Sequence, residues 1–530
     1  MIVIILSALA IIGALFAPRF VRPDAYATRL DRVEAGVRRF GPIVAAVLSI
    51  GIVWFVWDAI APIAKVHDEK SYLLQADIFA RGRWTVPSPP IPEFFEQPHV
   101  QVVPAVASKY PPGHAMLLTV GALVGFPPLV PLLLTGVTAA LLFGLAMRLT
   151  NPLIALLTWT IWISAPIVLR FQPSYFSELT TTALLLGSWW ALLEWRETRK
   201  TRWLLLMALG IGWGAITRPL TMLAFAIPIG VVVIRDVVRL RLWRDLGLAF
   251  AVGVAILGIL PLWSARTTGD WRLSPIELYR RDYLPFDKMG FTVDTTPPRR
   301  TVSPVLKVTY DYFLSARRQQ QLGSLPHIVA DRALNLTIAL FQGARLPLVP
   351  FAIIGLFFIS GPLQFAALSA LLLFIMHLPY AHWAPWTVYY LETAPLVGIV
   401  TAIGLWRAAQ LLLSDERQVR LAVLLLTAVI VVFAVPSIDH WRRDHRGRAA
   451  FYRRFASEVK KLPPHSIVFV QYTPRTAQHI DVVFNSANLD KEPVWIVHDL
   501  GARNAELRAR VPDRTSYDFD EDVLVQRLRR

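Results

Sequence analysis

Two acidic residues and a lysine in the first long polar segment of the chain have side chains suited to acid–base chemistry beside an anion. Asp68 and Glu69 are adjacent, and Lys109-Tyr110 stands directly before Pro111-Pro112 further along the same segment. A carboxylate can take the proton of an attacking hydroxyl group. A basic group held by rigid prolines can assist a departing phosphate. The segment is therefore a candidate for general-base catalysis.

The two carboxylates are not expected to act as a symmetric pair. Adjacent side chains point to opposite faces of an extended chain. On a helix they lie about 100° apart. One of Asp68 and Glu69 is therefore expected to carry the chemistry, and the other to orient the segment or an ion.

The elements that must position these residues are membrane helices. The chain has 530 residues, 55% of them hydrophobic, with a mean hydropathy of +0.48. Its apolar residues fall into runs close to the roughly 20 residues that cross a bilayer. The net charge of +17 comes largely from short basic loops between these runs, as expected for topology signals rather than nucleic-acid binding. The absence of Cys excludes disulfides and thiolate metal sites.

The basic loops also predict an orientation. The first apolar run, Ile2 to Ala17, is expected to be an uncleaved anchor, and the arginines between Arg19 and Arg39 mark a cytoplasmic loop. The next span then runs outward and delivers Asp68 and Glu69 to the external face. The apolar runs and basic loops alternate along the rest of the chain and predict about twelve spans, each near the length needed to cross a bilayer.

We therefore expect an all-α polytopic membrane protein with external juxtamembrane helices. The membrane domain covers 1–436, with a first external loop at 63–112 and a long external loop at 266–345. Residues 437–530 are expected to form a small external soluble α/β domain, because two β-branched runs, Ser466 to Tyr472 and Pro493 to His498, lie among polar segments.

Several ionisable residues fall near the outer ends of the predicted spans, where they are costly and often functional. Glu178, Arg170, Arg218 and Arg345 share this position. They predict a polar cavity that opens outward. The three arginines are candidate phosphate ligands, because a guanidinium group can bind two phosphate oxygens at once.

Three stretches resemble the polyprenyl-phosphate-sugar-dependent glycosyltransferases with the GT-C fold. The first two are His67-Asp68-Glu69-Lys70-Ser71-Tyr72 and Ser108-Lys109-Tyr110-Pro111-Pro112-Gly113. The third is the aromatic run from Trp386 to Pro395, which follows His382. This group includes the protein O-mannosyltransferases of glycosyltransferase family 39 and the lipid A aminoarabinose transferases. The aminoarabinose transferases have an Arg where this chain has Ser71, which puts that sugar in doubt but not the fold.

The resemblance implies a role for each matching residue. Asp68 is the expected catalytic base, with Glu69 beside it. Lys109 is the expected ligand of the lipid phosphate. The remaining implied contacts are with the donor phosphate, from Tyr110, Arg170, Arg218 and Arg345, and with the substrate, from Tyr72, Glu178, His382, Tyr389 and Tyr390.

The implied activity is inverting transfer of a hexosyl, pentosyl or related sugar from a polyprenyl phosphate to a lipid, glycan or protein acceptor. It would take place on the periplasmic or extracellular side of a cell membrane of the bacterial inner-membrane type. No required cofactor is expected, although a divalent metal is possible near the acidic pair: the histidines form no His-x-x-x-His pair, and no Gly-rich nucleotide loop appears. Partners would be the lipid-linked donor, the acceptor and membrane lipids, without nucleic acid.

The alternative is a transporter or flippase of lipid-linked anions, which would use the same basic residues without a base. The absence of visible internal repeats weighs against this alternative, because many transporters are built from repeats.

Overall fold

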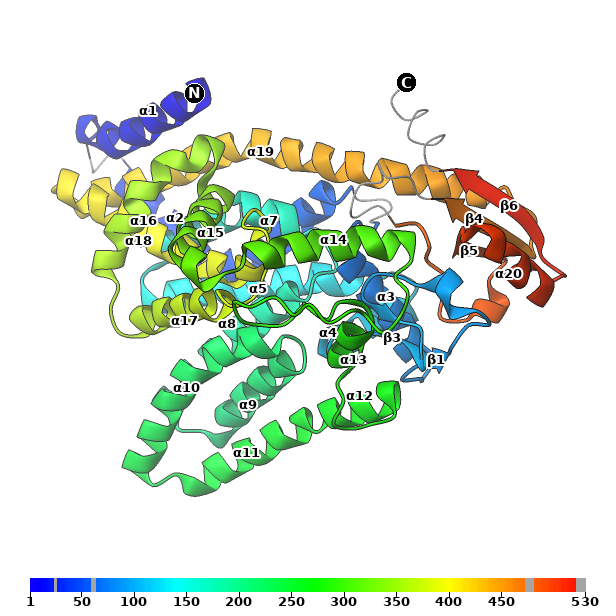
Figure 1. Ribbon diagram of the computed structural model, residues 1–530. Helices are drawn as coiled ribbons and strands as arrows, with labels where there is room; N and C mark the ends of the chain where they lie inside the picture. The colour runs from blue at the N-terminus through cyan, green and yellow to red at the C-terminus, as the bar shows by residue number, and fades with distance from the viewer. Residues whose placement is uncertain (23–25, 59–62, 472–480, 521–530) are drawn as a thin grey trace.

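The chain folds mainly into helices, which a computed structural model describes over residues 1–22, 26–58, 63–471 and 481–520. The helices form one body, and a small sheet lies at one end of the molecule (Figure 1). The long helix α19, Glu416–Val459, runs along the body and leads toward the sheet. The arrangement is that expected of a polytopic membrane protein with a small C-terminal domain.

Seven helical segments among the described residues are long and apolar enough to cross a membrane. They are Ile2–Phe20 (α1, Ile2–Phe16, with a 3₁₀ turn), Ala27–Val56 (α2), Leu129–Leu149 (α5), Pro219–Leu240 (α10), Trp243–Thr268 (α11, Trp243–Leu257, and α12, Ile259–Thr268), Thr387–Leu412 (η6, Thr387–Thr393, and α18, Ala394–Leu412) and Glu416–Val459 (α19).

One further pair of apolar helices is bent and forms either a broken span or a re-entrant loop. Helix α15, Leu325–Phe341, meets η5, Gly343–Leu348, and α16, Val349–Phe358, at an angle of 103°. The bend follows from sequence, because Gly343 adopts a positive φ of 68° that favours glycine.

Other apolar runs form helices that are too short or too polar to count among these spans. The shorter apolar helices are Gly113–Leu123 (α4), Pro152–Ile163 (α6) and Pro362–His377 (α17). Helices Pro166–Phe171 (α7), Glu178–Thr198 (α8) and Thr201–Ala215 (α9) complete this part. The structure thus has seven or eight full-length candidates among its described residues where the hydropathy pattern predicts about twelve spans. One reason is that Pro166 divides a single apolar run into α6 and α7.

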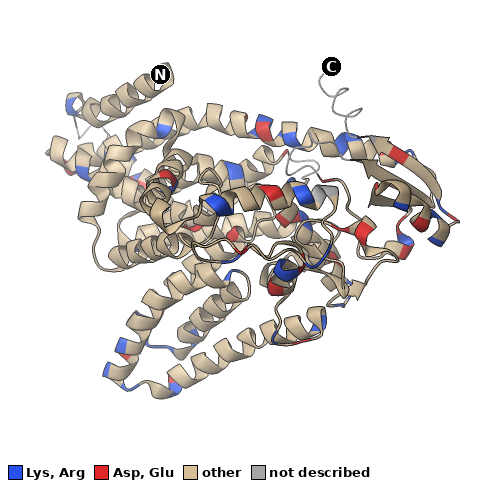
Figure 2. Cartoon of the chain, in the orientation of Figure 1, with Lys and Arg blue, Asp and Glu red and all other residues tan. Residues whose placement is uncertain are grey.

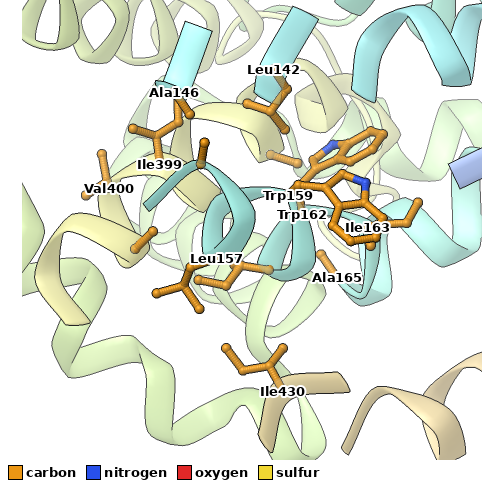
Figure 3. Packing of buried hydrophobic residues seen from close by; sticks show 14 of the residues in the cluster. Leu142, Ala146, Leu157, Trp159, Trp162, Ile163, Ala165, Ile399, Val400 and Ile430 are labelled. Carbon is orange, nitrogen blue, oxygen red and sulfur yellow. The ribbon is translucent and has the colours of Figure 1, made fainter. Parts of the chain in front are cut away.

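The main apolar core joins α5, α6, α18 and α19. Leu142 and Ala146 from α5 meet Leu157 and Trp162 of α6, with Ile399 of α18 nearby (Figure 3). Two glycines let α16 approach α18 closely: a Cβ atom on Gly404 would lie 1.8 Å from the carbonyl oxygen of Phe351. Packing in this core holds the helices in place, and the polar residues of the candidate site lie at the ends of such helices.

The predicted first external loop, residues 63–112 and called the first external segment below, forms a compact unit around α3, His67–Ala80. Three short antiparallel strands follow, in the order β1-β3-β2: Val86–Pro87 (β1), Val100–Gln101 (β2) and Ala105–Ser108 (β3). A 3₁₀ turn, Pro92–Phe95 (η3), lies between the first two. From the long loop, α13, Pro275–Tyr283, and α14, Pro304–Gln319, add two helices. Charged residues are frequent in these two segments and in the polar half of α19 (Figure 2).

The C-terminal sheet is parallel, with the order β5-β4-β6. Its elements are Ser466–Gln471 (β4), Val494–His498 (β5), Asn504–Arg510 (α20) and Thr515–Asp520 (β6). The two predicted strand runs match β4 and β5. The exceptions are Pro493, which precedes β5, and Tyr472, which lies outside the described residues. The predicted boundary at 437 falls within α19, which continues through Pro436 to Val459.

The small domain packs on the first external segment. Phe94 and Phe95 of η3 share an apolar cluster with Phe469 and Trp495. The Asp77 carboxylate of α3 accepts a hydrogen bond of 3.0 Å from the Ala487 backbone N–H. The C-terminal domain therefore supports the helix that carries the acidic pair.

Candidate functional site

A cavity of about 240 Å³ opens between the first external segment and the membrane helices. Its wall combines one end of α3, the Tyr110-Pro111 turn, the start of α10 and the loop before η6. Ile276 of α13 covers one side. A smaller cavity of about 30 Å³ adjoins it, since both are lined by Asp68, Tyr110, Tyr380, Trp386 and Tyr389.

Asp68 lies where the two cavities meet. It occupies the first turn of α3, where the helix dipole favours a negative charge. Its side chain is 27% exposed, and its Oδ1 accepts a hydrogen bond from the Tyr110 hydroxyl. His99 Nε2 lies 3.9 Å from Oδ2. Asp68 is therefore accessible from the cavity yet held in place.

Glu69 faces the opposite way, into the protein. It is 1% exposed, and its two oxygens accept hydrogen bonds from the backbone N–H groups of Lys65, at 3.2 Å, and Tyr175, at 3.0 Å. Burial raises the pKa of Glu69, while Lys65 and these two donors oppose that shift. Glu69 thus ties the start of α3 to the segment before α8, and only Asp68 of the pair lines a cavity.

A buried charge cluster forms the deeper wall. Arg218, at the start of α10, lies 2.8 Å from Glu178 Oε1 and 3.8 Å from Glu392 Oε1. Thr181 donates a 2.6 Å hydrogen bond to Glu392. The starts of α8 and α10 and the end of η6 therefore place one guanidinium group between two carboxylates. Arg218 and Glu178 line the larger cavity.

Aromatic rings cover the remaining sides. Tyr72 stacks on Tyr110, with ring centroids 4.8 Å apart, and donates a 3.1 Å hydrogen bond to Ser177. Tyr389 lies 5.6 Å from the Arg218 guanidinium carbon and 5.2 Å from the Tyr380 ring. Such rings offer flat surfaces and hydroxyl groups to a sugar.

Lys109 lines the smaller cavity with Asp68. It is 5% exposed, and its ammonium group lies 4.9 Å from the Tyr279 ring centroid and 5.3 Å from that of Tyr110. Burial lowers the pKa of Lys109, and the charges of Asp287 and Asp68 oppose that shift. Within the described ranges Lys109 forms no ion pair, so its charge is available to an anion.

His382 and Tyr390 are engaged with each other. The Nδ1 of His382 donates to the Trp383 carbonyl at 3.0 Å, and Nε2 accepts from the Tyr390 hydroxyl at 3.2 Å. Burial lowers the pKa of His382 to about 3, so the ring is neutral. His382 lines the smaller cavity, whereas the fully buried Tyr390 lines neither.

Two of the predicted phosphate ligands lie elsewhere. Arg170, on α7, lies against the rings of Phe171 and Trp386 and donates to the Pro385 carbonyl at 3.4 Å. Arg345, in η5, lines a separate cavity. The structure thus brings together Asp68, Tyr72, Lys109, Tyr110, Glu178, Arg218, His382 and Tyr389 around two adjoining cavities, and leaves Glu69, Arg170, Arg345 and Tyr390 outside their walls.

Several wall residues were not predicted from the sequence, including His377, Tyr380, Trp386 and His99. Trp386 begins the aromatic run that resembles the GT-C glycosyltransferases, so its aromatic side chain could have identified it. Tyr380 and His99 lie in irregular loops, where spacing predicts no face. Among the residues that the structure describes, no group of three or more His, Asp or Glu could hold a metal ion.

No protein-family model matches the chain, and no curated protein matches it. Several solved structures do match the chain. ArnT from Cupriavidus metallidurans in the apo state matches with a TM-score of 0.52 at 16% identity, over 89% of this chain and 88% of that chain. The same protein bound to undecaprenyl phosphate gives 0.49 at 17% identity, over 91% and 90%. The Archaeoglobus fulgidus oligosaccharyltransferase in the apo form gives 0.42 at 10% identity, over 82% and 63%. The apo ArnT likeness confirms the expected fold: the chain is a multi-pass membrane protein with the GT-C fold.

Proposed function

We propose that this protein is a glycosyltransferase that moves a sugar from a polyprenyl phosphate to an acceptor hydroxyl group. One observation carries the proposal: a partly exposed carboxylate, Asp68, lies between two adjoining cavities whose walls hold the cations Lys109 and Arg218. Base and cations are the groups that inverting transfer from a lipid phosphate needs. The ArnT structure with undecaprenyl phosphate supplies the ligand class to test first.

The reaction assigns one role to each group. The acceptor oxygen attacks the anomeric carbon of the sugar, and the bond from that carbon to the phosphate oxygen breaks. The acceptor's proton passes to Asp68, and the electron pair leaves with the polyprenyl phosphate. Because Tyr110 already donates to Oδ1, we assign the proton to Oδ2. The new bond forms on the face opposite the leaving phosphate, which gives inversion.

Lys109 is the better candidate for the phosphate. Arg218 is already shared by two carboxylates, so an anion beside it would compete with Glu178 and Glu392. Lys109 has aromatic neighbours and no ion pair among the described residues. Apolar side chains such as Leu220, Ile276 and Val388 in the larger cavity can receive the first isoprene units. Arg218 then holds Glu178 in place, and Glu178 orients the sugar of the donor.

We propose that the site faces the outside of the cell membrane, as the basic loops predict. This orientation can be tested because the chain contains no Cys. A single Cys at Lys491 in the C-terminal domain should react with an impermeant maleimide in intact cells. A Cys at Lys200, between α8 and α9, should react only after permeabilisation. The reverse labelling pattern would overturn the orientation.

Asp68→Asn tests the activity. The amide keeps the size of the side chain but accepts no proton at neutral pH, so transfer should fall by a factor of about 100 to 10,000. Donor binding should be retained. Glu69→Gln is the matched control and should cost less turnover, because Glu69 lines neither cavity. A flippase would move lipid without forming a glycosylated product and would tolerate Asp68→Asn, so normal lipid movement with no product from the wild type or the variant would reject the transferase. Unchanged product formation in the variant would instead reject Asp68 as the base.

A further inference from the structure

A second large cavity, of about 450 Å³, lies between α1, η5 and α19. Helix α1 packs against both of the other elements. None of the described residues that line this cavity also lines the cavities at Asp68. It is therefore a separate site, which the proposed glycosyl transfer does not use.

The cavity contains a buried cation without an acidic partner. Arg345 is 7% exposed, and its guanidinium group donates to the Leu340 carbonyl at 3.2 Å, the Ser164 hydroxyl at 2.5 Å and the Ile161 carbonyl at 2.8 Å. All three acceptors are neutral, and two belong to the last turns of α15 and α6. Over the described part of the chain, Arg345 forms no ion pair. Its charge is therefore only partly offset, by the negative ends of two helices.

Two of the five guanidinium N–H groups remain for a ligand, because three are used by these hydrogen bonds. Among the described residues no Asp or Glu lines the cavity, and the only other titratable group there is His440, exposed at the rim. A buried guanidinium group without a counter-ion is costly at membrane depth. The geometry and charge both favour an anion beside Arg345.

The rest of the wall is suited to a lipid chain. Val3, Ser7 and Ile11 form one face of α1, and Phe433 and Ala434 face them from α19. The cavity also lies where α19 changes from apolar to polar, since Val435 ends the apolar run and Asp439 begins the charged half. That change marks the membrane interface, where the phosphates of phospholipids lie.

We propose that this cavity binds one anionic membrane phospholipid, with its phosphate on Arg345 and an acyl chain between α1 and α19. The charge complementarity selects the phosphate, and the apolar wall selects the chain. Gln342 and His440 at the rim offer polar atoms to the glycerol and headgroup oxygens. The lipid would join α1 to the bend between α15 and α16. This site is independent of the proposed transfer reaction.

The test uses the full-length protein in nanodiscs of phosphatidylcholine with a minor fraction of phosphatidylglycerol. Native mass spectrometry measures the phosphatidylglycerol that stays bound. Arg345→Gln should weaken retention by about tenfold or more, because it removes a charge-assisted contact. Val3→Trp is a second variant, which fills the mouth of the cavity from a side chain that is 52% exposed. It should also lose the lipid while leaving Arg345 in place, and it keeps the test valid if Arg345→Gln does not fold.

Equal retention of phosphatidylglycerol by the wild type and Val3→Trp would overturn the proposal. So would displacement of phosphatidylglycerol by undecaprenyl phosphate in the wild type, which would assign the cavity to the carrier lipid. Arg443, an exposed residue further along α19, offers a matched control. Arg443→Gln should retain the lipid as the wild type does. Because the readout is lipid binding, failure here leaves the proposed transfer reaction standing.

Discussion

The cavities at Asp68 and at Arg345 differ in how their cations are balanced. At the first, Arg218 lies between the carboxylates of Glu178 and Glu392, and Asp68 stands within the same wall. At the second, Arg345 has only neutral acceptors among the described residues. The first combination offers bases as well as cations, whereas the second offers attraction to an anion and no base.

This difference separates chemistry from binding. A transfer reaction needs a group that takes a proton and a group that stabilises the leaving phosphate. Of these two cavities, the first holds both. A buried arginine near the predicted outer end of a span is thus not enough to identify a candidate active site. Both arginines look alike in sequence, and the residues that fold around them give them different charge environments.

The largest expected effect comes from removing the paired cation. Arg218→Gln leaves two buried carboxylates without their partner, which typically costs about 3–5 kcal/mol of stability. Arg345→Gln loses hydrogen bonds but also removes an unpaired buried charge, so its cost should be smaller. Thermal unfolding of both variants in detergent would compare them. Equal losses would break the distinction between paired and lone cations.

Lys109 should have the next largest effect, on donor binding. Lys109→Ala removes a charge-assisted contact worth about 1.5–3 kcal/mol, so donor affinity should fall by roughly ten- to a hundredfold. Arg345→Gln is the control and should leave donor affinity unchanged. Titration with undecaprenyl phosphate would measure both. If Arg345→Gln weakens donor binding more than Lys109→Ala, the cavities have been assigned the wrong way round.

The pH dependence of donor binding sharpens the role of Lys109. Burial lowers the pKa of this ammonium group below its ordinary value, so the charge is lost at lower pH than for an exposed lysine. Donor affinity should therefore decline early as the solution becomes alkaline. In Lys109→Arg the decline should disappear over the same range, because a guanidinium group stays protonated. An identical alkaline decline in both proteins would remove Lys109 from the phosphate site.

A smaller effect concerns the contact that holds α13 over the Asp68 cavity. The Tyr283 hydroxyl of α13 donates to Glu96 at 2.9 Å, and burial raises the pKa of Glu96 to about 7. A carboxyl group whose folded-state pKa is raised favours folding when protonated, so this contribution is lost as pH rises from about 4.5 to about 7. Glu96→Gln should flatten the dependence of thermal stability on pH across that range. An unchanged profile would show that the titration of Glu96 does not cause the pH dependence of thermal stability in this range.

The smallest expected effect is that of metal removal. We predict that EDTA leaves transfer unchanged, because cationic side chains in the Asp68 cavity can assist the leaving phosphate. Activity assays with and without EDTA, followed by added magnesium or manganese, would measure this. Loss of activity that a metal restores would contradict the prediction.

The fold class followed from the sequence because apolar run length is a strong signal in membrane proteins. The number of spans was predicted less accurately. Pro166 starts a separate helix within what reads as one continuous apolar run, and the bend at Gly343 turns another apolar stretch through 103°. Strand β6 was not predicted, because Asp518 and Asp520 are of a residue type that is depleted in strands.

The candidate site was easiest to predict in the first external segment, which supplies several of its side chains. Asp68 and Tyr110 were both identified in the first external segment, and the structure joins them directly by a hydrogen bond. The arginines were harder, because proximity to an outer span end does not say which way a helix faces. Arg345 turns to a different cavity after the bend, and Arg170 faces the rings of Phe171 and Trp386. Tyr380, in an irregular loop, gave no periodic signal.

The central claim is that the donor phosphate binds beside Asp68 rather than beside Arg345. A density map of the purified protein with undecaprenyl phosphate tests this most directly. We predict phosphate density within reach of Lys109, with the isoprenoid chain in the cavity lined by Leu220 and Ile276. Phosphate density on Arg345, with the Asp68 cavities free of lipid, would contradict the account.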